Sequence, residues 1–433
     1  MTDTLSNDRS YVFHSWSAQA ALAPLTIARA EGTRLWDEDG RELLDFSSQL
    51  INANIGYGNR AIVEAIKEQA EQLTTVAPQH AIAVRGEAAR KVIERAPEGF
   101  TRVFFTNGGA DANENAIRMA RQLTGRRKVI SGYRSYHGNT GAAVVATGDW
   151  RRVPNEYATD HVHVFTPYLY RSEFHATTPD EECERALRHL RRTIEAEGPS
   201  GIAAIILETI PGTAGVLVPP DGYLPGVRAL CDEFGIVMIL DEVMAGFGRS
   251  GEWLALDAFG ATPDLITFAK GVNSGYVPVG GVMISARVEQ HFADRVFPGG
   301  LTYSGHPLAM ASIVASLDAL AAEGVVDNAK AVGESVFRPR LDALAAARPD
   351  VVGEVRGKGV FWAVELIADA QTREPAAPAT VTAVKNGLIA GGVLPIVADN
   401  RIHVVPPCVI TPEDASAGLD VLDRVIGALP AAQ

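Results

Sequence analysis

The sequence has few cysteines, no recognisable leader and no uncharged apolar run long enough to span a bilayer. Its three thiols, Cys183, Cys231 and Cys408, are scattered and odd in number, which excludes a disulfide framework and favours a reduced, cytoplasmic location. The first residues, MTDTLSNDRS, contain neither a basic segment nor an apolar one, so we expect no secretory signal. We therefore expect a protein without membrane spans.

The chain also has fewer basic than acidic residues. Its formal net charge of −13 argues against nucleic acid or an anionic membrane as the main partner. With 433 residues, 47% of them hydrophobic, the chain is too long for one core and predicts two domains. We expect an N-terminal arm with part of a small domain (1–60), a large domain (61–310) and a C-terminal small domain (311–433).

Between about residues 100 and 280 a short apolar run, a loop and a helical stretch alternate. This alternation predicts an α/β fold whose large domain has a mostly parallel sheet between helices. The flanking segments differ, with strand, Asp-Gly turn and strand over 33–45, a helix over 309–322 and strands at 359–366, 393–396 and 401–405. A last helix begins after Thr411, which completes a smaller α+β domain.

Five apolar runs of the large domain end on residues that could bind a ligand or take part in catalysis. In sheets of this kind, ligands bind beyond the carboxyl ends of the strands. Residues 102–105 lead to Gly108 and Gly109 and a helix near Ala110, which favours an anion site or simply a tight turn. Residues 128–132 lead to the loop that holds Tyr136, His137 and Gly138. Taken alone, such a pair of aromatic residues is ordinary loop structure.

The other three runs end on charged side chains. Residues 202–207 end at Glu208 and residues 236–240 at Asp241, where a partly desolvated carboxylate needs a cationic partner unless it caps a helix. Residues 264–269 end at Lys270. Burial would lower the pKa of this amine and make it a nucleophile, whereas the alternative is a lysine paired with a carboxylate.

Together these residues match the needs of pyridoxal 5'-phosphate (PLP): an amine for its aldehyde, a carboxylate for its ring nitrogen and an anion site for its phosphate. Two other patterns compete with this interpretation. The segment GFGRSG (246–251) matches a dinucleotide motif, but residues 241–245 separate it from the strand. His161 and His163 have no third ligand nearby in the sequence, so we expect no metal site.

The chain resembles the class III (omega) aminotransferases of PLP fold type I over nearly its whole length. The resemblance is carried by FFTNGGADANENAIRMAR, YHGNTG, LDEVMAGFGRSG, PDLITFAKGVNSG and LTYSGHP. It is nearest to the taurine, beta-alanine and amine–pyruvate enzymes. It implies a ping-pong transamination from an amine or omega-amino acid to an oxo-acid such as pyruvate or 2-oxoglutarate. An aminomutase, decarboxylase or epimerase on the same scaffold is the alternative.

The resemblance also implies roles for particular residues. Lys270 would hold the cofactor as a Schiff base and act as general acid-base, and Asp241 would pair with the ring nitrogen. Thr302 would reach the phosphate of a neighbouring subunit, which implies at least a homodimer. The remaining cofactor contacts would be Gly109, Ala110, Tyr136 with His137 beside it, Glu208 and Val243.

Three departures from the family pattern concern anion binding. The phosphate turn reads Gly108-Gly109-Ala110-Asp111 and lacks one hydroxyl, and Asn139 stands where relatives carry an arginine. His403 occupies the place of a second arginine, which leaves Arg401 as the basic candidate nearby, on the same strand face. Leu50 and Ile51 would supply apolar pocket wall. We therefore expect a donor whose amine is distal to, or lacks, an α-carboxylate.

Overall fold

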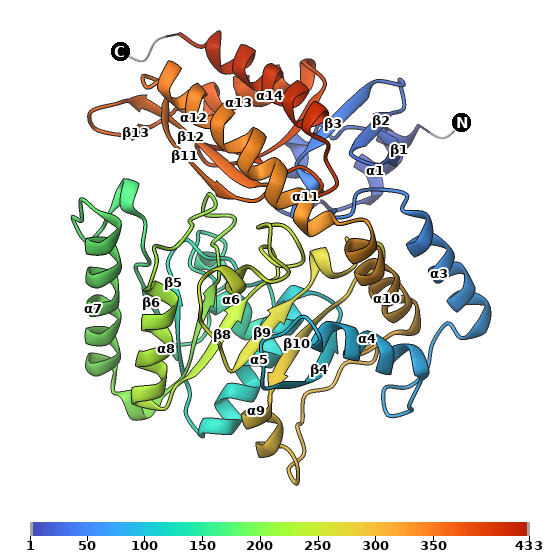
Figure 1. Cartoon of the computed structure of the whole chain (residues 1–433), viewed down its shortest axis with the longest axis vertical. Helices are drawn as coiled ribbons and strands as arrows, with labels where there is room; N and C mark the ends of the chain where they lie inside the picture. Colours follow the sequence, from blue (N-terminus) through green and yellow to red (C-terminus); the bar gives the residue numbers. More distant parts are fainter. Residues whose placement is uncertain (1–2, 431–433) are drawn as a thin grey trace.

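Two sheets organise residues 3–430, the part of the chain that the computed structural model describes (Figure 1). The larger unit holds a seven-stranded sheet in the order β4-β10-β9-β8-β7-β5-β6. Its strands are β4 (Phe100–Thr106), β5 (Lys128–Gly132), β6 (His161–Val164), β7 (Ile202–Glu208), β8 (Val237–Asp241), β9 (Leu265–Phe268) and β10 (Gly280–Ser285). All neighbours from β9 to β6 pair in parallel, so the expected mostly parallel sheet is confirmed.

The sheet has apolar side chains on both faces. Every residue of β7 is buried, and its neighbours Ile205 and Ile206 belong to different apolar clusters, one on each face. Parallel strands that are covered on both sides require such continuous apolar runs. The helices of this unit are α3 (Arg60–Gln72), α4 (Ala83–Ile93), α5 (Gly109–Thr124), α6 (Gly141–Ala146), α7 (Pro179–Glu197), α8 (Tyr223–Phe234), α9 (Ala286–His291) and α10 (Pro307–Ala322).

Strand β10 is a feature that the sequence pattern did not single out. It pairs antiparallel with both β4 and β9 and so separates them. Its sequence, GGVMIS, follows the glycine-rich loop after β9, and only a single 3-10 turn (Lys270–Val272) and no α-helix lies between the two strands. A short return of this kind permits only an antiparallel partner, because a parallel connection needs a crossover of a dozen or more residues.

The second sheet combines both ends of the chain. Its order is β1-β2-β3-β14-β15-β12-β11, and β3 pairs in parallel with β14. The strands are β1 (Ile27–Glu31), β2 (Arg34–Asp37), β3 (Glu42–Phe46), β11 (Val352–Lys358), β12 (Phe361–Asp369), β13 (Glu374–Pro375), β14 (Val393–Ala398) and β15 (Arg401–Val404). Figure 1 shows these blue and orange strands together above the large unit. We propose the two sheets as the cores of the two domains expected from the sequence.

The last helix of this second unit begins at the signal expected from the sequence. Thr411 caps the last helix, since its hydroxyl accepts a hydrogen bond from the amide of Asp414 at 3.1 Å. The remaining helices are α1 (Thr4–Tyr11), α2 (Ser48–Ile51), α11 (Val325–Val332), α12 (Arg338–Ala347), α13 (Pro378–Ala390) and α14 (Pro412–Gly427). Within residues 3–430, no single helix passes a length-and-hydropathy test for membrane spans, whereas the bent pair Pro307–Ala322 and Val325–Ala347 passes it jointly.

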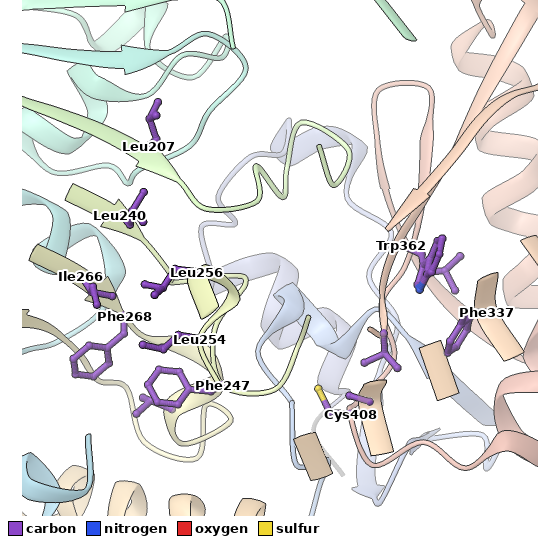
Figure 2. Close-up of a cluster of buried hydrophobic side chains, with 14 of the residues drawn as sticks. Leu207, Leu240, Phe247, Leu254, Leu256, Ile266, Phe268, Phe337, Trp362 and Cys408 are labelled. Carbon is purple, nitrogen blue, oxygen red and sulfur yellow. The ribbon is translucent and has the colours of Figure 1, made fainter. Parts of the chain in front are cut away.

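The loop after β8 joins the two units. Its apolar residues Phe247, Leu254 and Leu256 lie beside the strand ends, and Figure 2 shows Trp362 and Phe337 across from them, on the second unit. The rings of Phe247 and Phe268 meet edge to face with centroids 5.8 Å apart. The apolar core is therefore continuous from one sheet to the other.

Arg249, in the GFGRSG segment, lies fully buried at this junction. Its guanidinium donates to the Ser48 hydroxyl and the Asn54 side-chain oxygen, both at 2.9 Å, and to the carbonyls of Val360 and Pro406. Burial lowers the pKa of this arginine. The segment that resembles a dinucleotide motif therefore ties the two units together.

Replacing Arg249 with Met should destabilise the protein strongly, because four buried acceptors would lose their donor. Each orphaned acceptor costs about 1–3 kcal/mol, whereas a partly exposed ion pair contributes about 1 kcal/mol or less. The control is Arg340→Met, which removes only surface pairs with Asp420 and Asp423. Thermal melting would compare the two variants, and equal shifts in Tm would contradict the clamping role of Arg249.

Candidate active site

A cavity of about 340 Å³ lies at the carboxyl ends of the parallel strands, a size suited to a small-molecule ligand. It brings together residues that lie far apart in the sequence. Of the residues predicted from the sequence, it is lined by Leu50, Gly109, Ala110, Tyr136, His137, Glu208, Asp241, Val243 and Lys270. Ile51, Thr302 and Arg401 do not line it.

The wall at the start of α5 is built from tightly packed main chain. A Cβ atom on Gly109 would lie 2.7 Å from Val243 Cγ1, and one on Gly138 would lie 2.5 Å from Ala110 Cβ. Gly138 also has a φ of 132°, which favours glycine. The first amides of a helix have no intrahelical acceptor, so Gly109 and Ala110 present an anion site to the cavity.

The carboxylate of Asp241 is buried at the end of β8 and surrounded by donors. Its Oδ1 accepts from the Val243 amide at 2.9 Å, and its Oδ2 accepts from Asn113 Nδ2 at 2.7 Å. His137 Nδ1 lies 2.8 Å from the same Oδ2, while His137 Nε2 is buried without a hydrogen-bond partner. Three donors from three segments therefore fix one carboxylate toward the cavity.

Asn113 is a site residue that the sequence analysis missed. It lies one turn after Gly109 on α5, donates to the His137 carbonyl at 2.8 Å and accepts from the Thr267 hydroxyl at 2.6 Å. The available signal was the helical spacing of four residues, which places Asn113 on the same face as the anion-binding turn. Its amide carries both a donor and an acceptor, as the network requires.

Lys270 follows β9 and faces the cavity with a main-chain φ of 45°. Burial lowers the pKa of its amine to about 8, and the charges of Glu208 and Asp241 partly oppose that effect. The sequence prediction of a desolvated strand-end lysine therefore corresponds to the geometry. An amine with this pKa has a much larger neutral, nucleophilic fraction near physiological pH than an ordinary lysine has.

The side chain of Glu208 is hydrogen-bonded to the main chain of Tyr136. The carboxylate of Glu208 accepts from the amides of Tyr136 and Gly212, each at 2.9 Å. Burial raises the pKa of Glu208, although His137 and the two amides act in the opposite direction. The ring of Tyr136 stands in the cavity wall beside this carboxylate.

The remaining predicted residues lie elsewhere. Ile51 packs in an apolar cluster with Ile210 and Phe361 rather than in the cavity wall. Thr302 is exposed in the turn before α10. Arg401 pairs with Asp399, and its side chain packs against Gly215.

His403, which stands in the place of a family arginine, is buried. Its Nε2 lies 3.0 Å from the Gly212 carbonyl oxygen, so this nitrogen must carry the proton. Burial lowers the pKa of His403 to about 4, so the imidazole is neutral at physiological pH. His403 and Arg401 both face the loop after β7, as their spacing on the strand predicted.

These residues fit PLP. Free amides at a helix start suit a phosphate, the strand-end amine of Lys270 suits an aldehyde, and the fixed carboxylate of Asp241 suits a protonated ring nitrogen. The unpartnered Nε2 of His137 leaves one further polar atom without a partner beside Asp241. The described residues hold no cluster of three or more His, Cys, Asp or Glu side chains suited to a metal ion.

Comparison with known proteins gives the same result over almost the whole chain. A family model of the class III aminotransferases matches residues 16–426. The chain is 32% identical to a hypotaurine/taurine–pyruvate aminotransferase of Paracoccus denitrificans, covering 98% of this chain and 97% of that protein. It is 34% identical to a putrescine–pyruvate aminotransferase of Pseudomonas aeruginosa, covering 95% of each. A leucine/methionine racemase of Thermococcus litoralis is 32% identical, with 95% and 92% covered.

The fold agrees with solved structures of the same kind. A taurine:2-oxoglutarate aminotransferase from Bifidobacterium kashiwanohense, solved with PLP and glutamate, superposes with a TM-score of 0.94 at 40% identity. The match covers 98% of this chain and 96% of that one. An (S)-enantioselective omega-transaminase from Thermomicrobium roseum gives a TM-score of 0.92 at 36% identity, with 98% and 97% covered. The fold predicted from the resemblance is confirmed.

The depressed pKa of Lys270 predicts how its amine reacts in protein freed of cofactor. Only the neutral amine reacts with acylating reagents, so labelling of Lys270 should reach half its maximal rate near pH 8 rather than near the ordinary value of 10.5. Asp241→Asn removes a charge that raises this pKa and should move the midpoint lower. Peptide mapping by mass spectrometry as a function of pH measures both, and a midpoint near 10.5 would contradict the burial argument.

Proposed function

The chain belongs to the class III aminotransferases, and we propose that its donor is an amine or omega-amino acid and its acceptor pyruvate or 2-oxoglutarate. It is a PLP-dependent enzyme that transfers amino groups to oxo-acids. The observation that carries the site assignment is the convergence of Lys270, Asp241 and the free start of α5 on one cavity. Bound PLP supplies a protonated ring that withdraws electrons from the reacting carbon.

The residues of the cavity divide the work. Gly109 and Ala110 would bind the phosphate through their amides, and Asp241 would hold a proton at the pyridine nitrogen. Val243, Tyr136 and Glu208, which line the same cavity, would hold the ring. Because Asn113 and His137 both donate to Asp241, its carboxylate is held in one orientation.

Lys270 has two tasks. Its amine is the group that would hold the cofactor through its aldehyde, and, once released by the donor amine, it would serve as the general acid-base at the substrate carbon. A pKa near 8 suits this exchange, because the group can both accept and release a proton near neutral pH. Donor and acceptor use the same cavity in turn, which gives ping-pong kinetics.

The cavity favours a donor without an α-carboxylate beside its amine. Leu50 is 51% exposed and gives the cavity an apolar wall, and Asn139 stands in place of a family arginine. His403 is neutral and turned toward Gly212. Taurine, hypotaurine and putrescine, which relatives are named for, have no α-carboxylate. Arg401 stays a predicted acceptor ligand from the sequence, although it lies outside the cavity wall.

A donor panel tests this function. Taurine, beta-alanine, putrescine and ornithine would each be supplied with pyruvate or 2-oxoglutarate, and product amino acid and oxo product measured by chromatography. We expect the α-amine of ornithine to be the poorest substrate, and Lys270→Ala to reduce turnover by roughly a thousandfold or more. Borohydride reduction and peptide mapping should place the cofactor on Lys270. Racemisation of an amino acid without any acceptor would instead support the epimerase alternative.

We also propose a homodimer in which the partner's copy of Thr302 completes the phosphate site. Thr302 is exposed and does not line the cavity of its own chain, and Tyr303 beside it is 61% exposed. The phosphate turn lacks a hydroxyl donor, which a threonine from a second copy would supply.

The cysteines are all buried and free, which supports a cytoplasmic location.

Thr302→Ala should weaken PLP binding without changing the fold. Loss of one hydrogen bond to a charged group costs about 1.5–3 kcal/mol, or roughly a 10- to 100-fold rise in Kd. Equilibrium dialysis measures the Kd, with Ser304→Ala as the matched control because the Ser304 hydroxyl bonds Phe105 of its own chain. A fully active monomer in analytical ultracentrifugation would exclude the shared site.

A further inference from the structure

A separate cavity of about 210 Å³ adjoins the Arg249 junction and shares no lining residue with the candidate active site. Ser250 and Glu252 reach it from the loop after β8, and Lys358 and Gly359 from the turn between β11 and β12. The cavity is smaller than the roughly 300–1,000 Å³ of sites for drug-sized ligands. It therefore suits a small ligand held between the two units.

The walls of this cavity are held together by close main-chain contacts at three glycines. A Cβ atom on Gly333 would lie 2.2 Å from the Gly359 carbonyl oxygen, and one on Gly359 would lie 2.4 Å from the carbonyl carbon of Ser250. A Cβ atom on Gly251 would lie 3.0 Å from Lys330 Cα. Larger residues at these positions would push the three segments apart, so the cavity belongs to a rigidly packed region.

The charged side chains that line the cavity leave a positive excess. Its basic residues are Lys330, Arg338 and Lys358, and its acidic residues are Glu252 and Glu334. Lys330 pairs with Glu252 at 3.1 Å. In the described part of the chain, neither Arg338 nor Lys358 forms an ion pair, although Lys358 is half-buried. A partly desolvated cation is stabilised by an opposite charge, so these two side chains favour an anionic ligand.

Ser250 supplies the cavity with an unused hydrogen-bonding group. It is 1% exposed, and its hydroxyl has no hydrogen-bond partner among the described residues. A buried hydroxyl without a partner costs free energy, and native proteins seldom leave one unsatisfied. Trp362 forms an apolar part of the wall, where its Nε1 donates to the Gly359 carbonyl at 2.6 Å. The guanidinium carbon of Arg338 lies 5.0 Å from the centroid of the Trp362 ring.

We propose that this cavity binds a small oxyanion of the phosphate, sulfate or carboxylate class. Lys358 and Arg338 supply charge-assisted hydrogen bonds, and the Ser250 hydroxyl donates a further one. The bound anion bridges the two units beside the Arg249 junction, and because it binds only the folded arrangement, it stabilises the protein. The carboxylate of Glu334 opposes binding and limits its affinity. The site is independent of the transamination.

Isothermal titration calorimetry of the holoenzyme tests the site, because there the phosphate of PLP would fill the anion site at the start of α5. Phosphate, sulfate and malonate would each be titrated at constant ionic strength in chloride, and the three Kd values identify the preferred class of anion. We expect one saturable site per chain. Lys358→Gln should raise the Kd about 10-fold or more, through loss of a charge-assisted contact. Glu334→Gln should lower the Kd about twofold or more, because it removes an opposing charge.

The matched control is Lys385→Gln, because Lys385 is an exposed lysine of α13 that lies outside the cavity. It removes the same charge and should leave the Kd unchanged. Equal weakening in Lys358→Gln and Lys385→Gln would show a general attraction to charge and overturn the proposal. Unchanged affinity in Lys358→Gln, or no saturable heat with any of the three anions, would overturn it as well. Transamination should persist in each of these variants, so the transaminase function stands or falls separately.

Ser250→Ala separates a ligand-binding hydroxyl from a structural one. In chloride alone the variant should melt at the same Tm as the unaltered protein or higher, since alanine leaves no buried group unpartnered. The rise in Tm that phosphate or sulfate produces should shrink in Ser250→Ala and in Lys358→Gln. Both anions also stabilise proteins generally, and Lys385→Gln reports that general part. A lower Tm of Ser250→Ala in chloride, with an undiminished rise in phosphate and sulfate, would contradict the role of Ser250.

Discussion

The structure depends on holding one buried carboxylate, that of Asp241, in a fixed position in an apolar setting. A buried charge needs donors, and these come from the Val243 amide, from Asn113 on α5 and from His137 in the loop after β5. Asn113 is itself fixed by the hydroxyl of Thr267 on β9. The same residues that satisfy Asp241 form the wall of the cavity.

Much of this site could be predicted because its charged side chains stand out against the apolar sequence around them. Glu208, Asp241 and Lys270 are charged residues directly after strands that are otherwise apolar, and the sequence alone makes that conflict visible. Parallel strands place their carboxyl ends along one edge of a sheet, so the three had to converge. The sheet itself followed from the alternation of apolar runs and helices. Strand β10 was not predicted because its apolar run is short and because the strand pairs antiparallel with its neighbours.

The features that were not predicted depend on contacts between segments far apart in the chain. Asn113 is an ordinary polar residue in sequence, and only the approach of other segments gives it its partners. Arg249 was part of an apparent dinucleotide motif, yet its burial between two units makes it a structural donor. Ile51 was expected in the pocket wall beside Leu50, but a tight turn with φ values of 62° and 59° at Gln49 and Ile51 sends the two side chains in different directions.

His403 is committed to a structural role and is not free to bind a substrate anion. An arginine at this position would face the loop at Gly212. The neutral imidazole of His403 instead donates to the Gly212 carbonyl and stays buried. The amide of Gly212 in turn holds Glu208, and Arg356 bonds the Gly215 carbonyl of the same loop at 2.6 Å. This loop is thus anchored from the second sheet at both of these carbonyls. A side chain that anchors the loop through a buried hydrogen bond is not free to reach into the cavity, so an anionic substrate requires a cation from another wall.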